Sequence, residues 1–329
     1  MRNRVLTPLM IAVFLLSAGC GLNERAGGAN AADSLIINRF DKALYAVDDT
    51  AAWDRFAALY PEMLTVVGRA VFNTQDTHTP EFRDRVMNYF AEPTLNSMYA
   101  DALKTFDKVD AIEEALGQGF SYLHTAFPEM QQPAVYMHVS GFGQNLLVAD
   151  SLLSISIDKY LGADYPLYQD FFYDFQRQRM KPDYVAIDYL AAWLMSEYPF
   201  TGDDRVLLDR MIYEGKIKYI ISQALTNVIP ETLLKYSPDE YHWCRENEQG
   251  LWHIIIERQH LYTPDHVTTS KYLGEQPATF IANDAPPYPA VWLGLQIVRQ
   301  YVRRTKATPL ELMQTTDYQG ILAGAKYKP

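Results

Sequence analysis

The chain contains only two cysteines, Cys20 and Cys244, among its 329 residues. A disulfide framework needs more cysteines than this, and a zinc ribbon needs cysteine pairs at short spacing. The sequence therefore excludes both classes. Cys244 lies in the run EYHWCREN, which predicts a helix that carries a partly buried lone thiol.

Positive charge is also scarce. The chain has 29 basic and 40 acidic residues, a net charge of -11 at pH 7. The net charge of the remainder becomes -13 when Arg2 and Arg4 of the amino-terminal segment are left out. Phosphate backbones repel a body of this charge, so nucleic acid is excluded as a partner. Lipid phosphates repel it as well, so membrane attachment requires an anchor.

The sequence lacks the histidine pair of a zinc peptidase. No two of its seven histidines stand four residues apart, so the motif His-Glu-x-x-His is absent. The apolar run at 9–16, LMIAVFLL, is too short to span a bilayer as a mature helix.

The chain begins with a segment that has the pattern of an export signal. Residues 1–19 combine a basic start, the short apolar run and the small residues Ser-Ala-Gly, and Cys20 follows them. This arrangement resembles the bacterial lipobox, whose cysteine is diacylated and N-acylated, although Ser17 stands where the lipobox has Leu or Val. Several acyl chains such as palmitate would hold the protein stably on a membrane. Gly21 favours the outer membrane by resemblance to the usual sorting rule. The alternative is an ordinary secretory signal with a chance cysteine.

Residues 20–34 are small and polar, which predicts a flexible tether leading from a lipidated Cys20. Residues 35–329 are then expected to form a single domain of the α+β class, predominantly helical. Apolar residues recur at helical spacing in many segments. These segments are 35–60 with a break at 48–50, 81–90, 93–106, 109–127, 183–197, 206–224, 239–262, 291–304 and 309–313.

One region has the pattern of a sheet. The run AVYMHVSG at 134–141 alternates, and two further β-rich runs flank residues 149–151. We expect a single small sheet of three or four strands. His138 lies in the first strand, where a lone histidine among apolar residues is expected to be structural.

The rest of the chain is organised around residues 171–221. The first predicted helix of this stretch carries a broad apolar stripe that contains Asp188, and the second carries the pair Glu214-Gly215. A stripe of this width implies a helix that is buried on more than one side.

Several motifs together resemble a known family. They are SISIDKYLGADYPLY, YDFQRQRMKPDYV, LLDRMIYEGKIKYI, EYHWCRENEQGLW, VWLGLQIVRQYV and the terminal AKYKP. With the lipoprotein signal, they are similar to the gliding-motility-associated lipoprotein GldB family of Bacteroidetes. The resemblance implies an outer-membrane-associated lipoprotein that gliding species need for movement.

The same family is similar in outline to predicted zinc peptidases. The likeness implies a zincin-like helical core with one small antiparallel or mixed sheet. In such enzymes one helix presents His-Glu-x-x-His and a second helix supplies a Glu ligand, often within a Glu-Gly pair. Glu214-Gly215 matches the second element.

The first element of the zincin outline fails in this chain. With Asp188 at the first ligand position, the acid position holds Tyr189 and the second ligand position holds Ala192. Alanine cannot coordinate zinc, and a phenol is no carboxylate base. We therefore expect a former metal site, with Asp188 and Glu214 hydrogen-bonded to arginines. The expected partners are Arg177 or Arg179.

Two other groups of residues are weaker candidates. His253, Glu257 and His260 stand at positions i, i+4 and i+7 of one predicted helix face, which could hold a metal or form a solvated polar face. Asp158 and Asp164 with Glu214 could form an acidic site for glycoside hydrolysis. The aromatic residues around 171–175 are expected to be core or interface rather than a platform for sugars.

The leading hypothesis is a lipid-anchored envelope protein without a cofactor. It would face the periplasm from the outer membrane and act as a non-catalytic scaffold for partners in motility, secretion or envelope maintenance. The alternative is an envelope hydrolase, acting on peptide or glycan through a rearranged site near Asp188 and Glu214. A third hypothesis is a metal-binding module at His253, Glu257 and His260.

Overall fold

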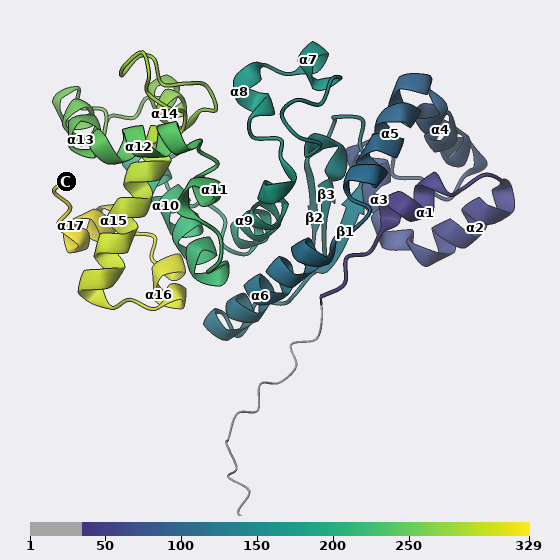
Figure 1. Ribbon diagram of the computed structural model, residues 1–329. Helices are drawn as coiled ribbons and strands as arrows, with labels where there is room; N and C mark the ends of the chain where they lie inside the picture. Colours follow the sequence, from purple (N-terminus) through teal and green to yellow (C-terminus); the bar gives the residue numbers. More distant parts are fainter. Residues whose placement is uncertain (1–34) are drawn as a thin grey trace, which may run out of the picture. The chain divides into compact units, whose positions relative to one another are not determined.

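The structure is a computed structural model that describes residues 35–329 (Figure 1). The predicted signal segment at 1–19, the tether at 20–34 and the lipidation of Cys20 fall outside the described residues. Helices dominate the described part of the chain, and one small sheet accompanies them. This confirms the predicted α+β class with helix predominant.

The sheet has three strands, β1 (Ala134–His138), β2 (Leu146–Ala149) and β3 (Leu152–Ser156). β3 lies in the middle, parallel to β1 and antiparallel to β2, as expected for a small mixed sheet. Leu153 and Ile155 of β3 belong to the main hydrophobic core, whereas Leu152 belongs to a second core. Because side chains alternate along a strand, the sheet separates the two cores.

The amino-terminal part of the described chain packs on the second core. The chain before the first helix is extended, because the backbone of Asn38 pairs with β1 through Val135 and Met137. The helix predicted from residue 35 therefore starts later than expected. Pro61 follows the segment predicted to be helical up to residue 60, and it opens a further helix, since proline at the first helical position loses no hydrogen bond. The helices are α1 (Phe40–Tyr45), α2 (Thr50–Leu59), α3 (Pro61–Ala70), α4 (Pro80–Ala91) and α5 (Pro93–Thr105).

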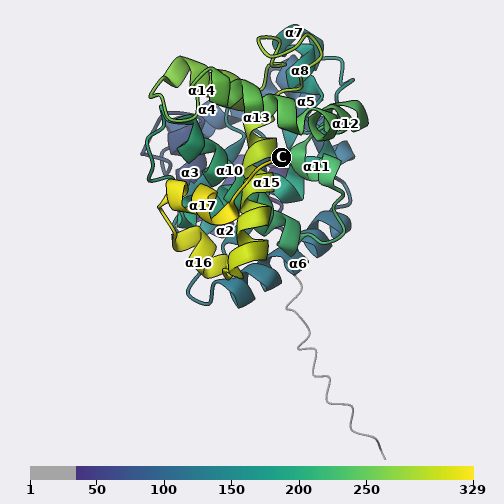
Figure 2. The ribbon, with the colours of Figure 1, turned by 90° about the vertical axis from the view of Figure 1, so that its left-hand side faces the viewer.

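The main core lies on the other side of the sheet and is built mainly from four long helices and the shorter α17. Figure 1 shows α9 between the sheet and α10. α15 packs against α10, and Figure 2 shows α15 and α17 lying side by side. α9 is buried on several sides, as its broad apolar stripe predicts, and α10 is buried on several sides as well. These helices are α6 (Asp110–Ala126), α9 (Val185–Glu197), α10 (Leu207–Ala224), α15 (Pro289–Thr305) and α17 (Tyr318–Ala325).

Shorter elements complete the described chain. The helix predicted over 239–262 is two helices, and the second ends at Glu257, because Gln259 adopts a left-handed φ of 55°. Within residues 35–329, no helix combines the length and the apolar character needed to cross a bilayer. The short elements are α7 (Tyr168–Phe171), α8 (Asp174–Arg177), α11 (Pro230–Leu234), α12 (Pro238–Glu246), α13 (Glu248–Glu257), α14 (His266–Leu273), α16 (Pro309–Gln314) and 3-10 turns at Ile157–Lys159 and Pro182–Tyr184.

Candidate functional site

Asp188 of α9 is held by an ion pair. Both of its carboxylate oxygens lie 2.7 Å from Nζ of Lys235, and one also accepts a hydrogen bond of 2.7 Å from the Tyr160 hydroxyl. The side chains of Asp188 and Lys235 are only 15% and 20% exposed. The ammonium group of Lys235 therefore contacts both oxygens of the carboxylate. The predicted pairing of Asp188 with Arg177 or Arg179 was wrong.

Glu214 of α10 forms a separate pair with its own helix. Arg210, one turn earlier, donates to Glu214 Oε1 over 3.0 Å. Burial raises the pKa of Glu214, although the charges of Arg210 and Lys218 oppose this. The arginines predicted as partners pair elsewhere, Arg177 with Asp174 and Arg179 with Glu240.

The remaining positions of the zincin outline are taken by packing. Tyr189 is fully buried and its hydroxyl donates to the carbonyl oxygen of Tyr136 in β1. Ala192 packs against the main core. α9 thus presents one carboxylate, Asp188, where a metallopeptidase helix presents two imidazoles and a glutamate.

Asp188 lines a small polar cavity of about 160 Å³. Lys159, Arg179 and Lys235 contribute positive charge to its wall, and Glu275 contributes a second carboxylate. The other lining residues are Asn145, Tyr160, Phe172, Gln176, Met180 and Tyr288.

Two residues of this wall adopt an unusual backbone conformation. Lys235 has a φ of 57° and Tyr288 a φ of 54°, both left-handed. Such a conformation costs a non-glycine residue about 1–3 kcal/mol, so the surroundings must enforce it. Lys235 follows α11 directly, and its side chain reaches Asp188 of α9. The backbone of Tyr288 is held by Gly274 and by the hydroxyl of Tyr236.

The charges of this region are partly desolvated. Burial lowers the pKa of Lys159. Burial and the positive charge of Lys235 lower the pKa of Lys218, on α10, to about 8. Arg179 is 8% exposed, lies 5.5 Å from the ring centroid of Tyr288, and its Nε has no hydrogen-bond partner among the described residues. Lys159 and Arg179 therefore place cations that water solvates poorly in the wall of the cavity.

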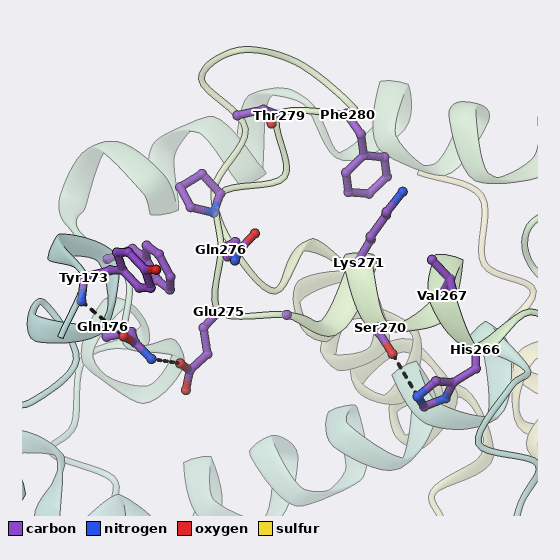
Figure 3. A pocket seen from close by; sticks show the side chains of 13 residues that line it. Tyr173, Gln176, His266, Val267, Ser270, Lys271, Glu275, Gln276, Thr279 and Phe280 are labelled. Atoms are coloured by element: carbon purple, nitrogen blue, oxygen red, sulfur yellow. Dashed lines mark hydrogen bonds between the residues drawn. The ribbon is translucent and has the colours of Figure 1, made fainter. Parts of the chain in front are cut away.

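A larger pocket of about 730 Å³ lies beside this cavity, between α8 and α14. Figure 3 shows Tyr173 and Gln176 on one side of it and Lys271, Ser270 and His266 on the other. Tyr173 is 72% exposed and stacks on Phe175 with ring centroids 5.5 Å apart. Tyr173 therefore lies outside the core, and the expected interface stays a prediction.

Of the predicted acidic site, Asp158 serves the fold. Asp158 is fully buried and accepts hydrogen bonds from the hydroxyl of Ser156 and from the backbone N–H groups of Ser140 and Phe142, whereas Asp164 is exposed. Burial raises the pKa of Asp158. Its carboxylate fixes the loop that connects β1 to β2.

His138 is buried beside this carboxylate network. Its Nδ1 lies 2.8 Å from the hydroxyl of Ser154, and burial lowers the pKa of the imidazole to about 3. The imidazole is fully buried in β1, where the sequence placed a structural histidine.

The three residues proposed as a metal group lie on and beyond α13. His253 and Glu257 form an exposed pair over 3.0 Å. His260 follows the end of the helix, and its Nδ1 lies 3.0 Å from the Tyr272 hydroxyl. In residues 35–329, no group of three His, Cys, Asp or Glu side chains is arranged to hold a metal ion.

The sequence did not single out Lys235, Tyr160 or Tyr288. Each comes from a segment far from Asp188 along the chain, and a left-handed lysine or tyrosine has no sequence signature comparable to that of glycine. The proline at 238, which opens α12, signals only that the chain turns close to Lys235.

Comparison with known proteins gives one match. The family described as "Gliding motility protein GldB" matches residues 26–329. No curated protein matches the chain, and no solved structure does. The matched region includes every described helix and strand, so the chain belongs to the GldB family of gliding-motility lipoproteins.

Proposed function

We propose that this protein is a lipid-anchored scaffold of the cell envelope that binds other proteins of the motility, secretion or envelope-maintenance machinery without catalysing a reaction. Cys20 carries the lipid, the outer membrane is its location, and the body faces the periplasm. The family membership supports the coarser part of this role, a lipoprotein connected with gliding motility.

The pairing of Asp188 with Lys235 is the main observation that supports a protein without catalytic activity. A general base or a metal ligand needs a free lone pair directed at the reacting atom or the metal. Here the ammonium group of Lys235 lies 2.7 Å from the carboxylate, and Tyr160 occupies another lone pair. Glu214, the other candidate, is paired with Arg210.

Fractionation tests the anchor. The whole chain, tagged at its carboxyl terminus, is expressed in its own bacterium with Cys20→Ser, and with Cys244→Ala as the matched control. The proposal expects Cys20→Ser to leave the membrane fraction and Cys244→Ala to stay there. A Cys20→Ser chain that remains in the outer membrane contradicts the anchor.

Crosslinking tests the scaffold. The Asp188→Asn/Lys235→Gln chain keeps the volume of both side chains and removes both charges. Under the proposal, in-cell crosslinking recovers the same envelope proteins with this variant as with the unaltered chain. A variant that folds and is anchored but loses its partners contradicts the proposed role of the pair.

A further inference from the structure

The polar cavity and the large pocket share two residues, Gln176 and Glu275. Nε2 of Gln176 donates to Glu275 Oε2 over 3.4 Å, which is long for a hydrogen bond, and Figure 3 shows this contact at the base of the large pocket. Gln176 belongs to α8, a helix of four residues, and Glu275 lies in the loop after α14. A weak side-chain contact therefore lies where the two spaces meet.

The inner cavity has more positive than negative charge around it. Its lining holds the cations Lys159, Arg179 and Lys235 and the carboxylates of Asp188 and Glu275. The excess of one positive charge stands in a chain whose net charge is -11.

Arg179 supplies an unused donor in this cavity. Two of its nitrogens donate to Phe175 and Glu240, over 2.5 and 3.1 Å, but its buried Nε has no partner within residues 35–329. A buried donor without a partner costs about 1–3 kcal/mol, so a site that keeps one is suited to an acceptor from outside. Lys159, whose contact with the Phe142 carbonyl is 3.3 Å, is a second donor in the same wall.

The outer pocket has different chemistry. Tyr173, Phe175 and Phe280 provide apolar faces, and Gln276, Ser270 and Thr279 provide uncharged polar groups. Val267, at its edge, is 62% exposed. A pocket that is mostly apolar with a few polar groups is typical of a ligand site.

We propose that the two spaces form one site for the free carboxyl terminus of a peptide. The terminal carboxylate enters the inner cavity and accepts hydrogen bonds from Arg179 Nε and Lys159. The preceding backbone replaces the Gln176–Glu275 contact, with a carbonyl oxygen on the Gln176 amide and an N–H on the Glu275 carboxylate. The side chains that come before it rest on Tyr173 and Phe175.

The charge and the size of the inner cavity favour a carboxylate over a phosphate. One carboxylate neutralises the single excess charge, whereas a phosphomonoester carries about -1.5 to -2. An extended peptide advances about 3.3 Å per residue and presents N–H and C=O groups alternately. These groups match the Glu275 carboxylate, an acceptor, and the Gln176 amide, a donor, where the two spaces meet. A sugar chain could present hydroxyl groups to the outer pocket. A neutral sugar chain has no negative charge to pair with the cations of the inner cavity.

Binding of two matched peptide pools tests the proposal. The whole chain, purified in detergent, is equilibrated with a degenerate pool of amino-terminally acetylated tetrapeptides, and the retained species are identified by mass spectrometry. The same pool with amidated carboxyl termini is the control. We expect retention of the acid pool and at least about tenfold weaker retention of the amide pool, because hydrogen bonds to a charged group contribute about 1.5–3 kcal/mol.

Variants locate the binding. Lys159→Gln should weaken binding of a retained acid peptide about tenfold. Its matched control, Lys42→Gln, removes an exposed lysine that lines neither space and should not change binding. Tyr173→Ala should weaken binding through the outer pocket, whereas Tyr262→Ala removes another exposed ring and should have no effect.

The outcomes separate cleanly. Equal retention of acid and amide pools, no retention of either, or competition by inorganic phosphate or chitotetraose but not by peptide each overturns the proposal. So does binding that Lys159→Gln leaves unchanged. The assay uses purified protein and depends neither on the anchor nor on cellular partners, so its failure is distinct from failure of the scaffold role.

Discussion

Gly215 of α10 packs directly against Gly294 of α15. A Cβ atom placed on Gly215 would lie 2.3 Å from the carbonyl carbon of Gly294, and one placed on Gly294 would lie 1.7 Å from the carbonyl oxygen of Met211. The two helices thus touch through their backbones in the main core. The glycine that follows Glu214 is explained by this crossing, whether or not the pair once belonged to a metal site.

Gly215→Ala should lower the free energy of unfolding by about 2–3 kcal/mol or more, because the new methyl group meets backbone that cannot move aside. Urea denaturation followed by circular dichroism measures this. The matched control is Gly250→Ala in α13, where a Cβ would meet nothing within 4 Å. Its helix propensity should raise stability by up to about 1 kcal/mol. Equal effects of the two substitutions would contradict the close crossing.

The Asp188–Lys235 pair should show strong coupling. Asp188→Asn and Lys235→Gln should each cost about 1–3 kcal/mol, since each leaves a largely buried charge without its partner. The double variant should cost less than the sum of the two. A double-mutant cycle from urea melts measures the coupling energy, and strict additivity would mean that the pair is not formed in solution.

Burial of His138 should make the free energy of unfolding decrease as the pH is lowered. Its pKa is lowered from 6.5 to about 3 by burial, so below pH 6.5 the unfolded chain binds a proton there that the folded chain does not. The contribution of His138 to the free energy of unfolding therefore falls as pH falls from 6.5 towards 3, by up to about 1.4 kcal/mol per pH unit.

Urea melts between pH 4 and pH 7 test this slope. His138→Gln should flatten the loss of stability on acidification, whereas His124→Gln, at an exposed histidine at the end of α6, should leave it unchanged. The same slope in the His138→Gln chain as in the unaltered chain would argue against a neutral buried imidazole.

Cys244 should be unreactive in the folded protein. It is fully buried, and burial raises the pKa of its thiol to about 12. Since the thiolate is the reactive form, iodoacetamide at pH 8 should leave Cys244 of a Cys20→Ser chain unmodified and should label it fully in denaturant. Mass spectrometry counts the modified thiols, and rapid labelling of the native chain would refute the burial.

The elements with strong periodicity were predictable from the sequence. α9, α10 and α15 bury broad apolar faces, and apolar residues alternate in β1 to β3 beside a clear turn. The periodicity of apolar residues was therefore enough to locate these elements. The start of α3 and the end of α13 were missed. At Pro61 a helix-ending signal is also a helix-opening one, and the left-handed Gln259 after α13 has no distinctive sequence.

The candidate site was only half visible in the sequence. Asp188 stood out as a charge within an apolar stripe, but its partner Lys235 is brought to it by the packing of α11 against the main core. The arginines nearer in sequence were the natural guess, and they pair with Asp174 and Glu240 instead. Long-range pairing of this kind depends on tertiary structure, which local pattern does not encode.

The central claim is that the body works as a scaffold whose Asp188 and Glu214 do no chemistry. The most direct measurement is complementation of a deletion strain by the Asp188→Asn/Lys235→Gln/Glu214→Gln chain, scored by motility or envelope integrity at matched protein level and melting temperature. The account predicts function equal to that of the unaltered chain. Loss of function in a triple variant that is folded, anchored and as stable as the unaltered chain would contradict it.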